Sequence, residues 1–413
     1  MAATLTYHEL NVQEIRQQFP VLHQQINGKP LVYLDNAATS QKPARVVAAL
    51  TGYYNGYNAN IHRGIHTLAE RATRAFEETR QTLRDFLGAA AVEEIIFTRG
   101  VTESINLVAH SFGKAFVRAG DEIIVSGLEH HSNIVPWQLM CADRGAQLKV
   151  IPVQADGTLN MQEYERLLNS RTRLVAVNHA SNSLGTINPV ARIISLAHQA
   201  GAHVLVDGAQ SGPHLEIDVQ ALDCDFYCLS AHKMYGPTGT GVLYGKRKLL
   251  EEMPPYMGGG EMIKNVSFAK TTYNELPYKF EAGTPNIADV VAFNEAIRFI
   301  NELSKPAIRT HEEALLRYAE QRLQAIPKVK LIGVAPEKVS VQSFTVAGVH
   351  PFDVGQLLDA RGIAVRTGHH CTQPLMDAFG LEGTVRASFA VYNTLEEVDK
   401  LAEGIEKIVT LTK

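Results

Sequence analysis

A carboxylate and an amine follow two apolar segments that have the character of buried strands. Residues 204–206 run into Asp207, and residues 226–229 lead through Ser230 and His232 to Lys233. Ligands of open α/β sheets bind beyond the carboxyl ends of the strands, so we expect Asp207 and Lys233 to share one edge. This pair suits pyridoxal phosphate, because a lysine amine can bind the cofactor covalently while a carboxylate keeps its ring nitrogen protonated.

Two other strand ends could complete such a site. The run TRGVT at 98–102 lies between a predicted strand and a predicted helix, where backbone N–H groups and Thr102 suit a phosphate. His130 follows another strand and could lie over the cofactor ring. Each residue alone is typical of a helix cap or a surface loop, and their joint occurrence favours a cofactor site. The chain lacks GxGxxG before a helix and GxxxxGK[ST], which argues against dinucleotide and P-loop sites.

The segment VRTGHHC at 365–371 suggests a nucleophile. Arg366, His369 and His370 around the Cys371 thiol would lower the pKa of that thiol and raise its reactivity. A buried cysteine beside a chance histidine pair is one alternative, and a metal site is another. The metal site is disfavoured because consecutive His and Cys residues reach one ion only with an irregular backbone. Arg386, in a later predicted strand, suits a substrate carboxylate or an ordinary ion pair.

The elements that would position these residues follow from the apolar pattern. Continuous β-branched runs separated by helices predict a largely parallel sheet that is buried on both faces. The strands are expected at 94–98, 121–126, 148–153, 174–178 and 204–207, with helices at 102–117 and 134–144. The stretch 253–286 has no clear period. A helix at 286–303 then leads to a smaller α/β unit with strands at 339–346, 363–366 and 384–389.

Length and composition agree with a soluble enzyme of two domains. A chain of 413 residues suits a large domain and a smaller one, and 45% hydrophobic with 20% charged residues is typical of a globular protein. The net charge of -4 argues against nucleic acid or an anionic membrane as a partner. Without an apolar span or a signal-peptide pattern, we expect a cytoplasmic protein. Cys141, Cys224 and Cys228 are interpreted as small buried side chains.

Ordered motifs along almost the whole chain resemble the cysteine desulfurases of the class V aminotransferase family, specifically the SufS-like branch (group II). The motifs are YLDNAAT at 33–39, NIHRGIHTL at 60–68, RGVTESINLVAHSF at 99–112, LEHHSNIVPWQ at 128–138, HASNSLGTINP at 179–189, VDGAQ at 206–210, DCDFYCLSAHKMYGPTGTGVLYG at 223–245, FEAGTPN at 280–286, VRTGHHC at 365–371 and VRASFAVYN at 385–393. One departure is Val101, where the family often has a second threonine.

The resemblance implies an α/β protein of pyridoxal-phosphate fold-type I that forms a homodimer. Residues 1–25 would pack with the small domain, residues 26–295 would form the large domain around a mostly parallel seven-stranded sheet, and residues 296–413 would form the small α/β domain. Lys233 would bind the cofactor, Asp207 would pair with its ring nitrogen and His130 would stack on its ring. Asn182 and Gln210 would lie near the ring hydroxyl. The phosphate would be bound by Thr102, Ser230, His232 and, from the other subunit, Thr284.

The resemblance also implies a substrate and a reaction. Arg386 would hold the carboxylate of L-cysteine, with Arg366, His62 and Asn182 also at the site. Cys371 would take the substrate sulfur as a persulfide while L-alanine is released. The short segment 368–373 suggests transfer of that sulfur to a docked SufE-like or SufU-like acceptor, for iron–sulfur cluster assembly in a SUF system. A selenocysteine lyase is the alternative activity, and a non-catalytic scaffold protein is the alternative class.

Overall fold

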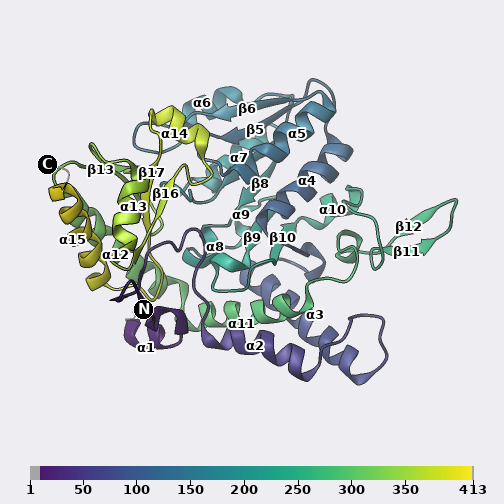
Figure 1. The fold of residues 1–413 in the computed structure, drawn as a ribbon. Coiled ribbons are helices and arrows are strands. Elements are labelled where there is room, and N and C mark those ends of the chain that lie inside the picture. Colours follow the sequence, from purple (N-terminus) through teal and green to yellow (C-terminus); the bar gives the residue numbers. More distant parts are fainter. Residues whose placement is uncertain (1–9, 412–413) are drawn as a thin grey trace, which may run out of the picture.

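Seven strands form the central sheet, and the computed structural model describes residues 10–411 of the chain (Figure 1). The strand order is β4-β10-β9-β8-β7-β5-β6, and every neighbouring pair is parallel except those made by β10. The largely parallel sheet predicted from the apolar runs is therefore confirmed. Its strands are β4 (Ile95–Thr98), β5 (Glu122–Ser126), β6 (Gln147–Ile151), β7 (Thr172–Asn178), β8 (His203–Asp207), β9 (Phe226–Ser230) and β10 (Gly241–Gly245).

Both faces of this sheet are buried by helices. Along β5, Ile123 and Val125 join one apolar cluster while Ile124 joins another, because successive side chains of a strand point to opposite faces. The cluster of Ile123 includes side chains of α4 (Val101–Phe116) and α5 (Val135–Arg144). The cluster of Ile124 includes side chains of α3 (Thr67–Leu87), α7 (Val190–Gln199) and α11 (Ile287–Leu303). The absence of polar alternation in the strand sequences reflects this two-sided burial.

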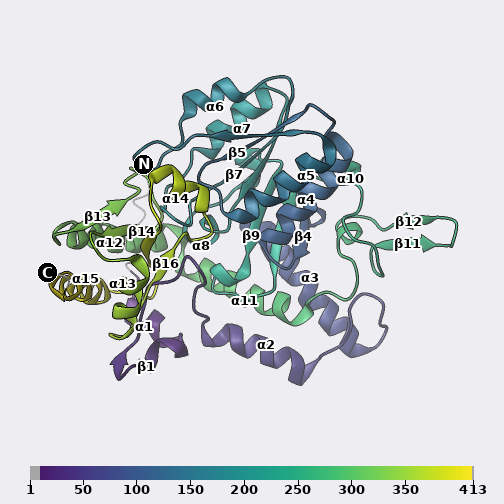
Figure 2. The ribbon, with the colours of Figure 1, turned by 45° about the horizontal axis from the view of Figure 1, so that its top comes forward.

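A smaller unit follows α11 and has an apolar core of its own (Figure 2). Its sheet is antiparallel, in the order β13-β14-β17-β16. The strand predicted at 363–366 is in fact two strands, because β15 pairs with β3 near the N-terminus while β16 pairs with β17. The elements are α12 (Lys305–Gln324), β13 (Val329–Ile332), β14 (Val341–Val346), α13 (Pro351–Asp359), β15 (Ile363–Ala364), β16 (Arg366–Gly368), α14 (Gln373–Phe379), β17 (Thr384–Ser388) and α15 (Leu395–Leu411).

The first described residues of the chain contact both units: Phe19 lies in the core of the large unit, whereas Arg16 contacts the smaller one. Helix α1 (Val12–Gln17) carries Arg16, whose guanidinium lies 3.0 Å from the carboxylate of Glu397 in α15 and also donates to the Tyr392 carbonyl. Strand β3 (Val32–Tyr33) then pairs with β15 of the same unit. The remaining elements are β1 (Gln25–Ile26), β2 (Lys29–Pro30), α2 (Ala44–Gly56), α6 (Met161–Leu167), α8 (Ser211–His214), α9 (Val219–Leu222) and α10 (Arg247–Glu252).

The aperiodic stretch 253–286 contains a hairpin that the sequence analysis missed. Strands β11 (Ile263–Val266) and β12 (Thr271–Tyr273) pair with each other and project from the body of the molecule (Figure 1). Val266 and Phe268 on this hairpin are exposed. Of the helices within residues 10–411, none is both long and apolar enough to cross a membrane.

A buried arginine ties the edge of the central sheet to α3. The Arg80 side chain is 1% exposed, and its guanidinium forms two hydrogen bonds with the Glu281 carboxylate, at 2.7 and 3.0 Å. The same guanidinium donates to the Ile95 carbonyl, while Glu281 accepts from the Phe97 N–H. The pair thus joins α3, β4 and the segment before α11.

Replacing Arg80 with Ala should lower the free energy of unfolding by about 3–5 kcal/mol, because Glu281 would keep a buried charge without its partner. Urea unfolding of the purified protein measures this. The matched control is Arg298→Ala, which breaks an exposed pair with Glu78 and should cost at most about 1 kcal/mol. If both variants lose the same free energy of unfolding, the stabilising role of the buried Arg80–Glu281 pair is contradicted.

Candidate active site

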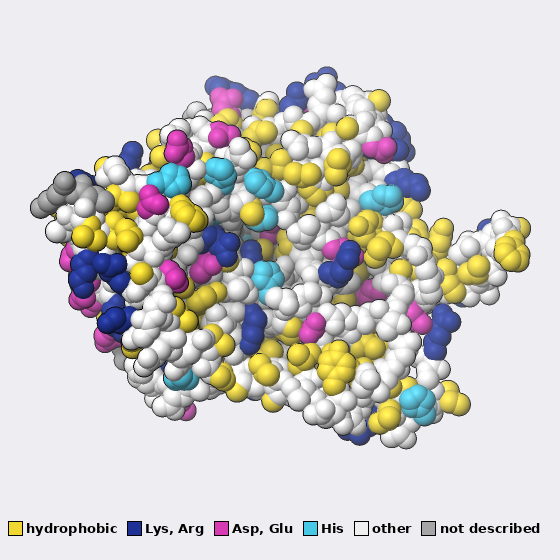
Figure 3. All heavy atoms as spheres, in the orientation of Figure 1, with side chains coloured by type: hydrophobic (Ala, Val, Ile, Leu, Met, Phe, Trp, Pro, Cys, Tyr) yellow, Lys and Arg dark blue, Asp and Glu magenta, His cyan; other side chains and the backbone are white. Residues whose placement is uncertain are grey.

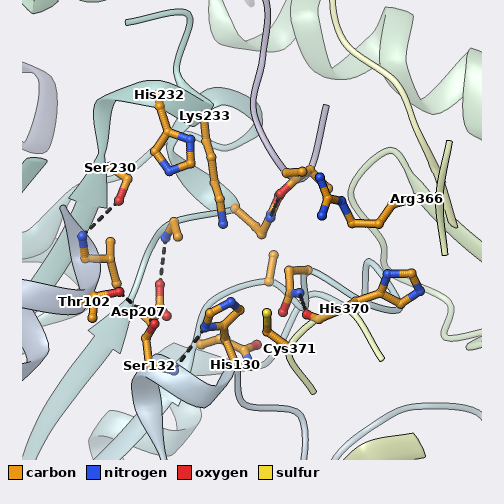
Figure 4. A pocket seen from close by; sticks show the side chains of 18 of the residues that line it. Thr102, His130, Ser132, Asp207, Ser230, His232, Lys233, Arg366, His370 and Cys371 are labelled. Carbon is orange, nitrogen blue, oxygen red and sulfur yellow. Dashed lines mark hydrogen bonds between the residues drawn. The ribbon is translucent and has the colours of Figure 1, made fainter. Parts of the chain in front are cut away.

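A cavity of about 300 Å³ lies at the carboxyl ends of β7, β8 and β9, where the smaller unit meets the large sheet. The space-filling view shows this face hollowed, with basic and histidine side chains gathered around the hollow (Figure 3). Most of the predicted site residues meet here (Figure 4). Those that line the cavity are Thr102, His130, Asn182, Asp207, Gln210, Ser230, His232, Lys233, Arg366, Cys371 and Arg386.

Asp207 and Lys233 form the floor of the cavity. Asp207 ends β8 and is 5% exposed, and its carboxylate accepts a hydrogen bond from the Ala209 N–H at 2.9 Å. Burial raises the pKa of Asp207, while the amide of Ala209 and the charge of Lys233 oppose that rise. Burial also lowers the pKa of Lys233 to about 8, against the attraction of Asp207. A sizeable fraction of Lys233 is therefore a neutral, nucleophilic amine near neutral pH.

The first residues of α4 line the cavity and bring N–H and hydroxyl groups that suit an anion. Gly100 is the N-cap residue, with φ of +145°, and a Cβ atom on the neighbouring Gly241 would lie 2.5 Å from the Gly100 Cα. Glycine at both positions permits this close approach. The Ser230 hydroxyl accepts from the Val101 N–H at 2.9 Å, and the Thr102 and Ser132 hydroxyls lie 2.8 Å apart. Hydroxyls beside the N-terminus of a 16-residue helix suit a phosphate.

His130 faces Lys233 across the cavity (Figure 4). Its Nδ1 accepts a hydrogen bond from the Ser132 N–H at 3.0 Å, which sets the orientation of the ring. Burial, followed by the charge of Lys233, lowers the pKa of His130 to about 4. The imidazole is therefore neutral at physiological pH and suits stacking on an aromatic ring. Gln210 donates to the Ala37 carbonyl at 2.7 Å on the neighbouring wall.

Cys371 is exposed, and it lies in a loop between β16 and α14 that contributes to the lining of the cavity. The backbone φ is +54° at His370 and +58° at Cys371, a left-handed conformation that is rare for residues with a Cβ atom. Asn182 donates from its side chain to the His370 carbonyl at 2.8 Å, which joins this loop to the large unit. The thiol thus enters the cavity opposite Lys233 (Figure 4).

The expected activation of Cys371 by two histidines is wrong in one respect. The His370 ring is buried and bonds the Thr384 hydroxyl at 2.8 Å, and burial lowers its pKa to about 2. It is therefore neutral and adds no positive charge near the thiol. His369 is exposed and does not line the cavity. The sequence shows that a histidine precedes Cys371, whereas the burial of His370 depends on the tertiary structure.

Two arginines from the smaller unit supply the positive charge at the cavity. Arg386 on β17 is 1% exposed, and it donates to the Asn182 carbonyl at 2.8 Å and to Asp35 at 3.1 Å. Burial lowers the pKa of Arg386 to about 10, which leaves the guanidinium charged. Its Nε has no partner among the described residues. Arg366 forms two-pronged contacts with Asp35 at 2.8 and 3.1 Å. Arg386 and Arg366 both line the cavity, and a charged guanidinium there suits a substrate carboxylate.

Asp35 was missed as a functional residue, although it lies in the motif YLDNAAT that was noted for its resemblance. Two predicted residues lie outside the cavity. His62 bonds the Glu77 carboxylate at 3.0 Å, and Thr284 is exposed. The expectation for Thr284 concerned the site of another subunit, so it stays a prediction, as does a substrate contact by His62.

Comparison with known proteins agrees with this arrangement. Residues 32–401 match the family model described as aminotransferase class-V. The chain belongs to this family. The expected cofactor of the family, pyridoxal 5'-phosphate, fits the site, because Lys233, the buried Asp207 carboxylate and the start of α4 offer one partner each to its aldehyde, ring nitrogen and phosphate.

Relatives and solved structures carry a common description. A "Probable cysteine desulfurase" from Halalkalibacterium halodurans is 51% identical over 96% of this chain and 98% of its own length. "Probable cysteine desulfurase 1" from Mycobacterium leprae is 53% identical, and the chain spans 65% of its length. The cysteine desulfurase CsdA (S-sulfonic acid) from Escherichia coli superposes with a TM-score of 0.92 at 40% identity, over 98% of this chain and all of that one. This likeness confirms the expected α/β class of pyridoxal-phosphate fold-type I.

Covalent attachment of pyridoxal phosphate should occur at Lys233. Reduction of the reconstituted protein with borohydride, followed by peptide mapping, should place the label on Lys233, and Lys233→Ala should carry none. Lys42 is the internal control, because burial lowers its pKa to about 8 as well, although Lys42 does not line the cavity. Its ammonium instead contacts the Thr39 hydroxyl and the His232 carbonyl. A label on Lys42 would contradict the assignment.

The lowered pKa of Lys233 predicts how attachment depends on pH. Only the neutral amine reacts, so the rate of covalent attachment to the apo protein should rise with pH and level off above about 8. Stopped-flow absorption measures this rate between pH 6 and 10. A rate that still rises steeply at pH 10 would mean that the amine keeps the ordinary pKa of an exposed lysine.

Proposed function

We propose that the protein is a pyridoxal-phosphate-dependent cysteine desulfurase, which converts L-cysteine to L-alanine and leaves a persulfide on Cys371. One observation carries the proposal: a cavity that is lined by a lysine of lowered pKa is also lined by an exposed thiol and a buried, charged arginine. The lysine and Asp207 suit the cofactor, the arginine suits an amino-acid carboxylate, and the thiol is left as the acceptor of sulfur. The family and the printed descriptions of the relatives support the same reaction.

The site residues divide the reaction between them. When bound, pyridoxal phosphate supplies an electron sink for bonds at the substrate carbon atoms. Arg386 orients the substrate through its carboxylate, and the neutral His130 ring covers the opposite side of the cavity. Lys233, with a pKa of about 8, can take a proton from the substrate Cα and return a proton to carbon. Asp207 would stabilise a proton on the ring nitrogen of the cofactor, because its buried carboxylate accepts from the Ala209 N–H and has capacity for a further donor.

Cys371 completes the transfer of sulfur. Its thiolate attacks the substrate sulfur, so an S–S bond forms as the substrate carbon–sulfur bond breaks. The electron pair of the broken bond goes to the substrate carbon, which takes up a proton, and L-alanine leaves. The products are one alanine and one persulfide for each cysteine, so atoms and electrons balance without an added oxidant.

The finer assignments also belong to this proposal. The loop of residues 368–371 is short and runs directly into α14, which favours delivery of the persulfide to an acceptor protein that docks at the cavity. That geometry supports a group II enzyme of a SUF-type system for iron–sulfur cluster assembly, with a SufE-like or SufU-like acceptor. We propose a homodimer in which Thr284 serves the site of the other subunit, since it is exposed and lies outside its own cavity. We also propose a large and a small domain, each with an apolar core. The boundary expected between 295 and 296 is better placed after α11, because Ile297 and Ile300 of that helix lie in the core of the large unit.

Exchange of Cys371 for Ser should separate cofactor binding from sulfur transfer. The variant should keep the visible absorption of the cofactor and its change on addition of L-cysteine, because the exchange alters none of the cofactor contacts. Alanine and persulfide should fall to background, as measured by an amino-acid assay and intact mass. Cys141→Ser is the control, because burial raises the pKa of that thiol to about 11 and it does not line the cavity. Alanine release by Cys371→Ser at the parent rate would refute the nucleophile.

The same assay with L-selenocysteine tests the alternative activity. A carbon–selenium bond breaks more readily, so a selenocysteine lyase depends less on the thiol. If Cys371→Ser releases alanine from selenocysteine at the parent rate, and the parent is nearly inactive on cysteine, the alternative replaces the proposal.

A further inference from the structure

His131 contacts the loop of the nucleophile at the reactive residue and again at the start of the helix that follows. Its backbone N–H donates to the carbonyl of Cys371 at 2.8 Å. Its ring Nε2 accepts a hydrogen bond from the N–H of Gln373 at 3.1 Å, at the first residue of α14. One residue of the large unit thus holds the positions at Cys371 and two residues beyond it. The sequence analysis assigned a role only to the preceding His130.

The loop needs such contacts because its backbone is strained. His370 and Cys371 both have positive φ, in a region that steric contacts with the Cβ atom disfavour. Residues stay in this region where neighbouring structure holds them. Asn182 holds the His370 carbonyl at 2.8 Å, and the Thr372 N–H bonds the carbonyl of His369 at 2.8 Å within the loop. The contacts of His131 extend this restraint from residue 370 to the start of α14.

The position of His131 also links the nucleophile to the ring histidine. His130 caps a short 3-10 turn (His131–Asn133), and the Nδ1 of His130 accepts from Ser132 in that turn. The residue that orients the cofactor-facing ring and the residue that holds the loop are therefore adjacent on one rigid turn. A fixed distance between His130 and Cys371 follows, because both are bonded to this turn.

We propose that His131 is a positioning residue, whose ring keeps the Cys371 loop in the left-handed conformation that places the thiol in the cavity. The ring acts by accepting from Gln373, so its Nε2 carries no proton in this state. The role of the thiol rests on the proposed function, whereas the restraint on the loop does not. The chemistry of the cofactor is unaffected, because His131 does not line the cavity.

The test compares His131→Ala, His131→Gln and His369→Ala in the cofactor-loaded protein. The Ala variant keeps the backbone N–H bond to Cys371 and loses only the ring acceptor. We expect faster exchange of the Gln373 amide hydrogen, read from a peptide that begins several residues before Gln373. We also expect persulfide formation on Cys371 to slow about fivefold, which is the effect of one hydrogen bond. The KM for L-cysteine and the cofactor spectrum should stay as in the parent. The Gln side chain offers an oxygen near the position of Nε2. His131→Gln should therefore restore much of the slow exchange and much of the rate of persulfide formation.

His369→Ala is the matched control, since its exposed ring makes none of the contacts that hold the loop. Parent-like exchange and parent-like persulfide formation in His131→Ala would overturn the proposal. Loss of the cofactor spectrum in that variant would overturn it as well, because His131 would then act on the cofactor. If the parent protein makes no persulfide but the Gln373 amide still exchanges faster in His131→Ala, the restraint on the loop is supported and only the proposed function is refuted.

Discussion

The convergence of parallel strand ends is the constraint on which this site depends. Parallel pairing of β7, β8 and β9 places Asn178 beside Asp207, and Asp207 beside Cys228 two residues before Ser230. The polar residues that follow these strands therefore meet at one edge of the sheet, although they lie far apart in the sequence. The antiparallel β10 then runs beside β9 and β4, and brings the start of α4 against Ser230. The covalent, electrostatic and phosphate-binding parts of the site are thus set by sheet topology.

The smaller unit adds what the sheet edge lacks, and hydrogen bonds across the junction fix its place. Arg386 donates to the carbonyl of Asn182, and Asn182 donates to the carbonyl of His370. Arg386 and the loop that carries the Cys371 thiol are therefore held against the same residue of the large unit. Arg386 lies on β17 and Cys371 in the loop after the neighbouring strand β16, so a shift of the unit would move both together. Their shared contact with Asn182 restrains the distance between the Arg386 guanidinium and Cys371.

Sequence reasoning identified most of the fold and the site where the signal was local. Apolar runs such as 204–206 showed buried strands, and the polar residues after them lie at the predicted edge. It failed where the determinant was distant in the chain. Strand 363–366 is split because residue 363 pairs with Val32 while Arg366 pairs with Arg386, and neither partner is visible from the run itself. The hairpin at 263–273 pairs with itself and has no apolar face on a core, so it lacked the expected alternation. The neutral state of His370 depends on burial, which its neighbours in sequence do not reveal.

Asp35 explains how two arginines can share one small cavity. Two guanidinium groups repel each other, and each lowers the stability of the other when water is scarce. Asp35 bonds both, so the pair and the carboxylate carry a net charge of one instead of two. The remaining positive charge at this edge of the cavity suits an anionic group. Asp35 thereby lets both guanidinium groups line one cavity without an unbalanced repulsion between them.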